Sequence, residues 1–547
     1  MSDNELTPDE AAALPVEPTG AEFDDDHELT GAPEPESSTR RPVSAKAAAA
    51  IGARVVGGVL GIGIAAAAVL GSTFVELPSS TATPPSELVV PVPTAQQLTC
   101  PGPLLRLSDE SGAAASTVFT LGQAVTRFSS STGAVEQSRI SASDAQPGES
   151  VAEPLVLSAA PDAQSPDLDV LLSGAQSQSV AVGDYVGFAS AACRAVGGDS
   201  WLVGGATTTG RTTLISLTNP TEVASTVDLE IFDERGVVSA AGTGGIVVPP
   251  NGQRVLSLAG FAPGISSPVV HVTSSGGQIT AELQQSIVRG LDAGGVEIIG
   301  ATQPPARSVF LPGMVVTNLE AIQALRGTAA QTDDVITAIR VFVPGEESTT
   351  ISFTLTPADT ERDPIRFTRD VSAGVVTDIP IEELETGAYS VQIESDEPVV
   401  AAARTTSAVI ASGGGISATD FAWFTASPAL TEDTQFTVAS GLDAVLNVVN
   451  PGDTDVVVSL VAAGAAADGP ADADASASDE SADDQTANEY TIEAGATLRV
   501  PVPNGETLTL VHSSRVFVSV TQAGEGFMSA YSIDPQTPGS SPLTVFP

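Results

Sequence analysis

The sequence predicts an all-β ectodomain of tandem Ig-like β-sandwich units, which follows a disordered tail and one transmembrane helix. Three observations lead to this prediction. Ala, Val, Gly, Thr and Ser dominate the 547 residues and aromatic residues make up only 4%, a composition typical of small β-cores and turns. One uncharged apolar run lies near the amino end, and one strand–turn–strand pattern recurs further along. At this length several domains are expected.

The net charge rules out one class of partner. The chain carries 67 acidic and 21 basic residues, a formal net charge of −46, and its single lysine is Lys46. The phosphates of a nucleic acid would repel such a chain, so no nucleic-acid partner is expected. The alanine-rich, lysine-poor composition is typical of a GC-rich bacterium, and a salt-adapted archaeon is the alternative.

Residues 1–54 are predicted to form a disordered, acidic tail with a basic flank. The first 39 residues hold twelve Asp or Glu and no Lys or Arg. Their few apolar side chains could not offset the entropy lost on ordering the segment. The basic flank consists of Arg40, Arg41, Lys46 and Arg54.

The run from Val55 to Val75 is predicted to be a transmembrane helix. It contains no charged residue, and its length at about 1.5 Å per residue matches a hydrocarbon core of about 30 Å. Basic residues precede it and none follows closely, so the positive-inside rule places the tail in the cytoplasm and residues 76–547 outside. A buried core helix and a cleaved signal peptide are the alternatives; the long acidic leader favours an uncleaved anchor.

Residues 76–97 are predicted to be a stalk. The segment is rich in Pro, Ser and Thr. Because proline fixes φ and removes an amide donor, such a stretch is semi-extended and would hold the following units away from the membrane.

The two cysteines of the chain, Cys100 and Cys193, are predicted to form a disulfide. Outside the cytoplasm an even pair is more often bridged than free. A reactive thiol would need a nearby base, and no histidine lies between His27 and His271. We expect the disulfide to link the ends of a divergent β-unit, residues 98–198.

The recurring pattern consists of an alternating apolar run, a proline turn and a second alternating run. Period-two alternation indicates strands with one buried face, and Asn-Pro or Pro-Gly marks the turn between them. The first runs with their turns are TTLISLTNP (212–220), TAIRVFVPG (337–345) and AVLNVVNPG (444–452). The second runs are TVDLEIFD (226–233), TTISFTLTP (349–357) and DVVVSLVAA (455–463).

The spacing of the pattern predicts one sandwich per repeat. The turn prolines at 220, 344 and 451 are 124 and 107 residues apart, and a seven-stranded sandwich needs about 100 residues. A propeller blade of about 40–50 residues is too short. The predicted units are residues 199–300, 301–425 and 426–547. Leu217, Val343 and Val449 are expected to point into three separate cores.

Residues 465–489 interrupt the last unit. They include eight acidic residues, no basic residue and no apolar period, which predicts a disordered loop between strands. Asp472, Asp474, Ser476 and Asp483 match positions 1, 3, 5 and 12 of a calcium loop, but Ala477 replaces the glycine of position 6. Low-complexity acidic segments give such matches by chance, so no metal site is predicted.

No catalytic, cofactor-binding or metal-binding residues are predicted. His27, His271 and His512 have no metal-ligand spacing with one another or with cysteine, and no known nucleophile or phosphate-binding motif occurs. Carboxylate pairs could meet in space, but nothing in the sequence selects a pair. Trp201 and Trp423 stand in strand-like runs and are expected to be core residues rather than sugar-binding platforms.

The stretch from the stalk to the first repeat resembles a known family. LTCPGPLL, then AAC, then WLVGGATTTGRTTLISLTNP is similar to a family of membrane-anchored, exported actinobacterial proteins classed as a domain of unknown function. The resemblance covers about residues 96–547. It implies an actinobacterial host and the topology described above, but no activity. The residues that carry it are Cys100, Cys193, Trp201, Gly204, Gly205, Asn219 and Pro220.

These observations predict a single-pass cell-envelope protein whose large extracytoplasmic part binds or scaffolds and is not an enzyme. Its expected partners are the membrane, through one integral helix, and an envelope protein or a glycan; no cofactor is expected. One alternative is a cell-wall-modifying enzyme whose site lies in residues 98–198. Another is a salt-adapted surface-layer protein. Close, buried carboxylates at a cleft between units would favour the enzyme, and an exposed sheet edge would favour the binding protein.

Overall fold

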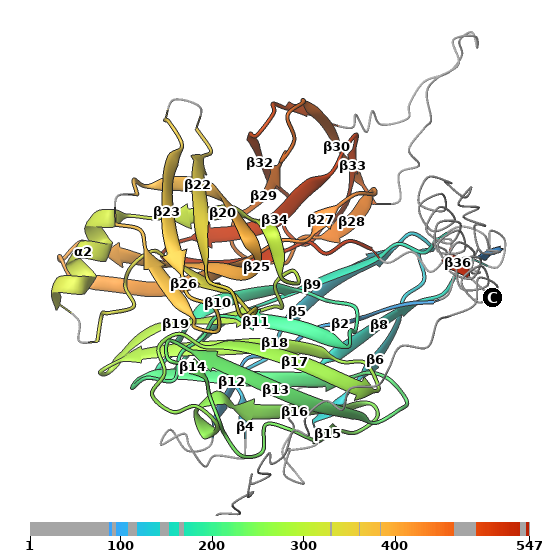
Figure 1. Cartoon of the computed structure of the whole chain (residues 1–547), viewed down its shortest axis with the longest axis horizontal. Coiled ribbons are helices and arrows are strands. Elements are labelled where there is room, and N and C mark those ends of the chain that lie inside the picture. Colours follow the sequence, from blue (N-terminus) through green and yellow to red (C-terminus); the bar gives the residue numbers. More distant parts are fainter. Residues whose placement is uncertain are drawn as a thin grey trace, which may run out of the picture. The chain divides into compact units, whose positions relative to one another are not determined.

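Most of the chain after residue 94 is described by a computed structural model. The described residues are 87–89, 95–107, 118–142, 153–162, 169–328, 331–359, 362–382, 384–463, 488–536 and 543–545, all within one unit, Ser86–Pro547. The predicted tail, the predicted membrane helix, most of the stalk and nearly all of the acidic insert lie outside them. Among these residues no helix is long and apolar enough to cross a membrane. The all-β prediction is confirmed (Figure 1).

The first unit spans the described residues from 95 to 193 and is built from small sheets. One sheet has the order β2 (Gln96–Thr99), β8 (Leu155–Ala159), β6 (Glu136–Arg139). A second has the order β10 (Tyr185–Ala192), β9 (Leu172–Val182), β5 (Val125–Ser130). A third pairs β3 (Leu105–Leu107) with β4 (Val118–Thr120).

The second unit, residues 199–299, places two sheets on either side of one core. The first sheet contains β11 (Asp199–Val203), β17 (Val269–Gly276), β13 (Ser225–Asp233), β14 (Gly236–Val237) and β15 (Ile246–Val248). The second has the order β19 (Asp292–Ile299), β18 (Thr280–Arg289), β12 (Arg211–Asn219), β16 (Gly252–Ser257), β7 (Ser141–Ala142). Strand β7 comes from the first unit, so the two units share a sheet. A 3-10 turn, η1 (Leu258–Gly260), follows β16.

The third unit, residues 306–425, is organised by one long strand, β25 (Gly387–Ile410). The first half of β25 pairs with β20 (Ala306–Val316) and β22 (Thr349–Pro357), and β23 (Ile365–Val371) extends that sheet. The second half pairs with β21 (Ala338–Phe342) and β26 (Ile416–Thr425), and β24 (Thr377–Pro380) pairs with β21. Strand β25 therefore passes from one sheet of the unit into the other.

A helix that the sequence did not predict connects β20 to β21. It is α2 (Leu319–Thr328). Its apolar residues Ala321, Ile322 and Leu325 recur at helical spacing and pack with Val335 and Ala408. The repeat pattern begins again only at β21, so the pattern did not predict any structure for the connection between β20 and β21.

The fourth unit, residues 429–533, again has two sheets. One contains β27 (Ala429–Leu430), β34 (Val516–Gly524), β29 (Ala444–Val449), β32 (Thr497–Val502) and β35 (Phe527–Ser532). The other has the order β28 (Thr434–Thr437), β33 (Thr507–His512), β30 (Val456–Ala462), β31 (Asn488–Ile492). The acidic insert joins β30 to β31, which are antiparallel neighbours. Near the ends of the described chain, β1 (Glu87–Val89) pairs with β36 (Leu543–Val545).

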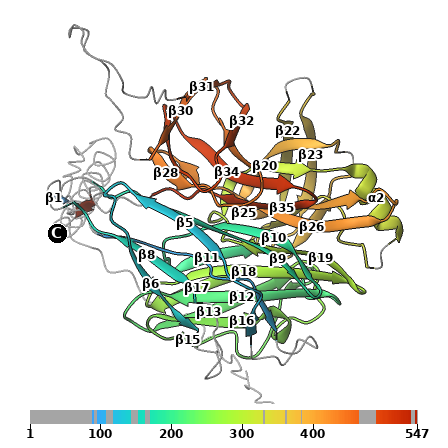
Figure 2. The same cartoon turned by 180° about the vertical axis from the view of Figure 1, so that it is seen from behind.

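Each unit ends in a β-hairpin, and the last strands of these hairpins meet. In the described chain the hairpins are β9–β10, β18–β19, β25–β26 and β34–β35. Strand β10 contacts β19, β19 contacts β26, β26 contacts β35, and β35 contacts β10 (Figure 2). Each pairs only with its hairpin partner among the strands described, so all four are edge strands. We call these four strands the strand ring.

The hydrophobic cores of the units interlock around the strand ring. The core of the second unit includes Phe421 and Trp423 of the third, and that of the third includes Met528 and Ala530 of the fourth. Likewise Val296 and Ile298 of the second unit lie in the core of the first, and Ala175 of the first lies in that of the fourth. Each core thus takes side chains from the next unit, and the fourth takes one from the first.

The expected core positions are only partly as predicted. Leu217 and Val343 are fully buried in the cores of the second and third units. Val449 instead packs with Phe310 and Phe517, between the third and fourth units. The reason is that β29 is buried on both faces, so alternation cannot tell its core face from its contact face.

Candidate functional site

A cleft of about 300 Å³ lies where the chain leaves the strand ring. Its walls include residues just after β10, β19, β26 and β35, that is, the connections that lead out of each unit. Strands β2, β9, β11, β18 and β28 complete the lining. We call it the axial cleft. Its polar lining consists of amides, hydroxyls and a few charged groups: Gln96, Ser173, Arg194, Asp199, Ser200, Thr280, Thr302, Gln303, Gln435, Thr437, Asp534 and Gln536.

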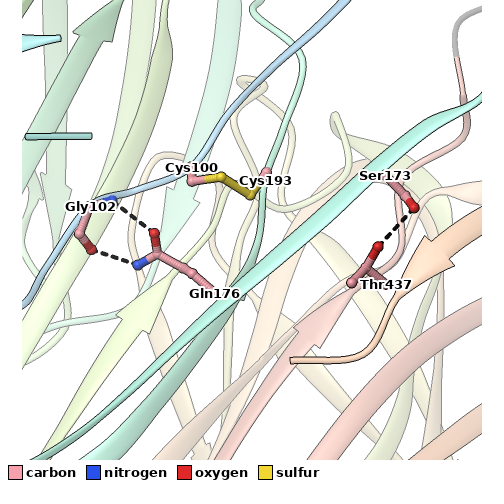
Figure 3. The surroundings of a disulfide bond; sticks show 6 residues. All are labelled: Cys100, Gly102, Ser173, Gln176, Cys193 and Thr437. Carbon is pink, nitrogen blue, oxygen red and sulfur yellow. Dashed lines mark hydrogen bonds between the residues drawn. A yellow bond between two sulfur atoms is a disulfide. The ribbon is translucent and has the colours of Figure 1, made fainter. Parts of the chain in front are cut away.

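The predicted disulfide is present and stands in the wall of this cleft. Cys100, just after β2, is bonded to Cys193, just after β10, with their Cα atoms 4.1 Å apart (Figure 3). Close by, Gly102 N donates to Gln176 Oε1 (3.0 Å), and Gln176 Nε2 donates to Gly102 O (2.5 Å). The disulfide and this amide pair hold the segment after β2 against β9 and β10. No other cysteine exists in the chain, so no free thiol faces the cleft.

Arg194 closes the inner end of the axial cleft. Its guanidinium donates to Ala301 O (2.5 Å), to Ser532 Oγ (2.7 Å) and to the Asp534 carboxylate (3.1 Å). Ser532 lies in the fourth unit, and Ala301 and Asp534 follow directly after the second and fourth units. Arg194, in the connection that leaves the first unit, therefore ties the ends of three units together. Because Asp534 balances its charge, Arg194 gives the cleft no net positive charge.

Behind Arg194 lies a small internal cavity with a buried acid, Glu282. The cavity has about 10 Å³, room for about one water molecule. Glu282 is 2% exposed, and neither carboxyl oxygen has a hydrogen-bond partner among the residues described. Burial raises the pKa of Glu282 to about 8, although Arg194 acts in the opposite direction. Glu282 is therefore mainly protonated at neutral pH.

Further along the strand ring, Asp420 binds the backbone of every unit. Its Oδ1 accepts from Phe421 N (3.0 Å) and Val296 N (3.1 Å), and its Oδ2 accepts from Phe188 N (3.0 Å) and Met528 N (3.4 Å). Burial raises the pKa of Asp420 well above its ordinary value, and the four N–H groups oppose that rise. Since all four contacts are donors, the ionised carboxylate is the form that fits the site.

Glu297 and Ser529 satisfy a second set of ring groups. Glu297 Oε1 accepts from Ile298 N (3.0 Å) and from Ser529 Oγ (2.7 Å), and Ser529 Oγ accepts from Ser190 N (2.8 Å). Burial raises the pKa of Glu297 well above its ordinary value, and the Ser529 hydroxyl opposes this. Edge strands leave N–H groups unpaired, and buried N–H groups need acceptors. Asp420, Glu297 and Ser529 therefore act as acceptors that join the ring.

One comparison with known proteins bears on the whole arrangement. Residues 145–503, about two thirds of the chain, match the model of a family described as a family of unknown function, DUF5719. The chain belongs to the DUF5719 family. No curated protein and no solved structure matches it significantly. The DUF5719 match includes β10, β19 and β26 with Glu297 and Asp420, and it ends before β35.

A second polar cluster of the DUF5719 region joins the second and third units. The Asp334 carboxylate accepts hydrogen bonds from Arg211 Nη2 (2.7 Å) and Arg289 Nη2 (3.1 Å). The Arg404 guanidinium lies 3.8 Å from the same carboxylate. Burial raises the pKa of Asp334, but the three arginines outweigh burial and the net pKa is lowered. The four groups pair mainly with one another, although Arg289 Nε and Arg404 Nε have no hydrogen-bond partner among the described residues. This mutual pairing indicates a structural role.

Of the other residues weighed in the sequence, Trp423 lines the small cavity beside Glu282, and His271 and His512 line neither this cavity nor the axial cleft. His271 is held between Asp199 (2.8 Å) and Glu230 (3.0 Å) and stacks on Trp201 with ring centroids 4.1 Å apart. Trp201 and Trp423 are buried core residues, as predicted. His512 bonds two backbone carbonyls, and His27 and the four calcium-loop residues lie outside the described part. Among the described residues, no three His, Cys, Asp or Glu are placed to bind a metal.

The sequence did not single out Glu282, Glu297 or Asp420. A signal for them exists, because each interrupts a strand whose neighbouring positions are apolar: ITAEL, GGVEIIG and ATDFAWF. An acid at such a position is rarely buried unless it is paired or hydrogen-bonded. Nothing in the sequence showed that β19 and β26, which carry Glu297 and Asp420, meet in the strand ring, or that β18, which carries Glu282, borders the axial cleft.

Proposed function

We propose that this DUF5719 protein is a non-catalytic binding or scaffolding protein of the cell envelope. In this proposal residues 55–75 span the membrane once, the tail lies in the cytoplasm, and the tandem Ig-like units lie outside, in an actinobacterial host. The uncharged apolar run with its basic flank supports the anchor and its orientation. The disulfide supports an oxidising compartment, where such bonds persist.

The axial cleft is the observation that carries the binding role. It is built jointly by residues of the first, second and fourth units, and it is lined mainly by hydroxyls, amides and apolar walls. A concave, largely apolar site with a few convergent polar groups is the usual form of a ligand site. The ion pair of Arg194 with Asp534 and the disulfide fix its walls in place, so the site is pre-formed.

A photo-crosslinking experiment in intact host cells tests this role. The full-length chain would carry a photoreactive amino acid at Pro304, an exposed cleft residue, or at Val237, which is 71% exposed on the second unit and outside the cleft. We expect adducts from position 304 and few from position 237. Equal yields, or no adduct from position 304, would reject the cleft as a binding site.

Protease treatment of protoplasts tests the topology separately. Added protease should degrade residues 76–547 and leave the acidic tail intact. Protection of the large part would overturn the proposed orientation.

A cell-wall-modifying enzyme is the second candidate, and Glu282 is the observation that favours it. A buried carboxyl with a raised pKa beside a cleft is a common feature of active sites. The site would then lie behind Arg194 rather than within residues 98–198 alone. Glu282→Gln separates the two roles: a binding protein would keep its adduct at position 304, whereas an enzyme would accumulate uncleaved substrate there.

A further inference from the structure

The axial cleft lies along a seam of unusual construction, between the first and fourth units. In the described chain short connections lead from each unit to the next, but none joins the fourth unit to the first. Besides the apolar packing of Ala175, polar side chains hold this seam: Ser173 Oγ lies 2.8 Å from Thr437 Oγ1 (Figure 3), and Gln435 Nε2 donates to Ser129 O (3.0 Å). Polar contacts of this kind can be exchanged for contacts with a ligand at little cost.

One side-chain amide spans the seam where the cleft is lined by both units. Gln536 Nε2 donates to Leu172 O (3.0 Å), at the start of β9, and to Gln435 O (3.2 Å), in β28. Its Oε1 is buried and has no hydrogen-bond partner among the described residues. The amide therefore satisfies two backbone carbonyls while its own acceptor is left unpaired, a costly arrangement.

The strand beside this amide has one edge that no other described strand pairs with, although side chains cover it. Strand β28 pairs with β33 alone among the described strands. On the other edge Gln435 O and Thr437 O are bonded by side chains, Gln536 Nε2 and Tyr531 Oη (3.2 Å), where a further strand would supply backbone N–H groups. In the same cleft the hydroxyl of Thr280, a residue only 5% exposed, also has no partner in the described chain.

The chemistry of the lining selects the class of ligand. Asp534 neutralises Arg194, so a phosphate or a carboxylate finds no unpaired cation in the described lining. Phe436, the aromatic residue of the lining, is only 2% exposed and offers no face for a sugar to stack on. What the cleft presents is carbonyl acceptors, hydroxyls and apolar walls such as Ile279 and Pro428. A neutral chain with regularly spaced N–H donors fits these groups.

We propose that the axial cleft binds an extended polypeptide segment. The segment displaces the side-chain amide of Gln536, donates backbone N–H groups to Gln435 O and Leu172 O in its place, and lies along the edge of β28 that no other described strand pairs with. This inference rests on the binding role proposed above and names the ligand class of that same site.

Peptide selection against the full-length chain in detergent micelles tests the proposal. A library of random linear peptides on phage would be selected, and the affinities of the recovered peptides would be measured by fluorescence anisotropy. Gln536→Ala should tighten binding by about threefold or more, because no amide has to be displaced. Pro304→Arg, which adds bulk at an exposed position of the cleft, should weaken binding by about tenfold or more. Gln137→Ala, an exposed glutamine on β6 and outside the cleft, is the matched control and should change nothing.

Two outcomes would overturn the proposal. One is the recovery of peptides whose affinity neither Gln536→Ala nor Pro304→Arg alters. The other is the recovery of no peptide that binds more tightly than about 100 µM. Crosslinks from position 304 to a glycan, with no peptide binding, would keep the binding role and reject the peptide. The absence of any crosslink would reject both.

Discussion

At the scale of the residue, Asp420 resolves two problems that each unit would face alone. A buried carboxylate is costly without donors, and the last strands of the four hairpins have N–H groups without strand partners. Placing the carboxylate at the meeting point of β10, β19, β26 and β35 satisfies both. The acid is therefore part of the fold, and its four contacts explain why it lies within an otherwise apolar strand.

Replacing Asp420 by Asn should expose this dependence. Asparagine has nearly the same shape but one acceptor oxygen, so its NH₂ group would face two of the four N–H donors. The free energy of unfolding should fall by about 2–4 kcal/mol, measured by urea denaturation of the full-length chain in detergent. Asp453→Asn, at an exposed turn, is the control and should have little effect. Equal stability of both variants would contradict the assigned role.

Glu282 should make the stability of the protein depend on pH. Its pKa is raised from 4.5 in the ordinary state to about 8 in the folded protein. Between these values the folded state holds a proton that the unfolded chain lacks, so its contribution to stability is complete below pH 4.5 and is lost as the pH rises towards 8. The loss is at most about 1.4 kcal/mol per pH unit.

The test compares denaturation at pH 5 and pH 8. Glu282→Gln should reduce the drop in unfolding free energy between these pH values, by up to about 4 kcal/mol. Glu346→Gln, an exposed control, should leave the drop unchanged. If Glu282→Gln shows the full drop of the unmodified protein, this carboxyl is not the titrating group.

At the scale of the element, edge strands are brought together by close approach of their backbones. Gly295, on β19, has a φ of 115°, and a Cβ at that position would lie 2.4 Å from Asp420 Oδ1. Glycine is therefore required here for both conformation and space. It lets β19 come near enough to donate the N–H of Val296 to the carboxylate.

Gly295→Ala should separate β19 from β26. We expect the free energy of unfolding to fall by about 1–3 kcal/mol more than in Gly236→Ala. Gly236 has the same φ, 115°, and a Cβ built there would lie no closer than 3.6 Å to its nearest neighbour, Gly374 O, so it controls for backbone strain. Equal losses in the two variants would show that the contact with Asp420 does not matter.

The strands themselves could be read from the sequence, and their partners could not. The run STVDLEIFD alternates between buried and more exposed positions in β13, as its period predicts; the last outward residue, Phe232, is half-buried. In β12 and β29 nearly every side chain is buried, because neighbouring units cover the outer face. That face is covered by residues from distant parts of the chain, and local period carries no information about them. The axial cleft depends on the same packing between units, so it could not be predicted from the sequence either.

At the scale of the whole molecule, interlocked cores change what a single cavity does. Separate cores were expected to confine damage to one unit, but Leu217 shares its core with Phe421 and Trp423 of the next unit. Those two residues lie on β26, which also carries Asp420. A cavity in the core of the second unit should therefore also destabilise the strand ring.

Leu217→Ala should destabilise more than its own unit. The cavity left by the shorter side chain should lower the free energy of unfolding by about 2–5 kcal/mol. In hydrogen–deuterium exchange followed by mass spectrometry, protection should fall in β26 and β35 as well as in residues 199–299. Val457→Ala, at a position 38% exposed on β30, is the control. Faster exchange confined to residues 199–299 would restore the model of independent units.

The interlocked cores also fix how the gene for this protein can change. In a string of independent domains a copy can be duplicated or deleted, and the neighbours fold as before. Here the loss of the third unit would remove Phe421 and Trp423 from the second core, Asp420 from the ring, and the core that receives Met528 and Ala530. An added copy would have to be inserted between strands that already touch. Packing therefore holds the number of units at four, and additions are accommodated in the loops within a unit, as the acidic insert between β30 and β31 illustrates.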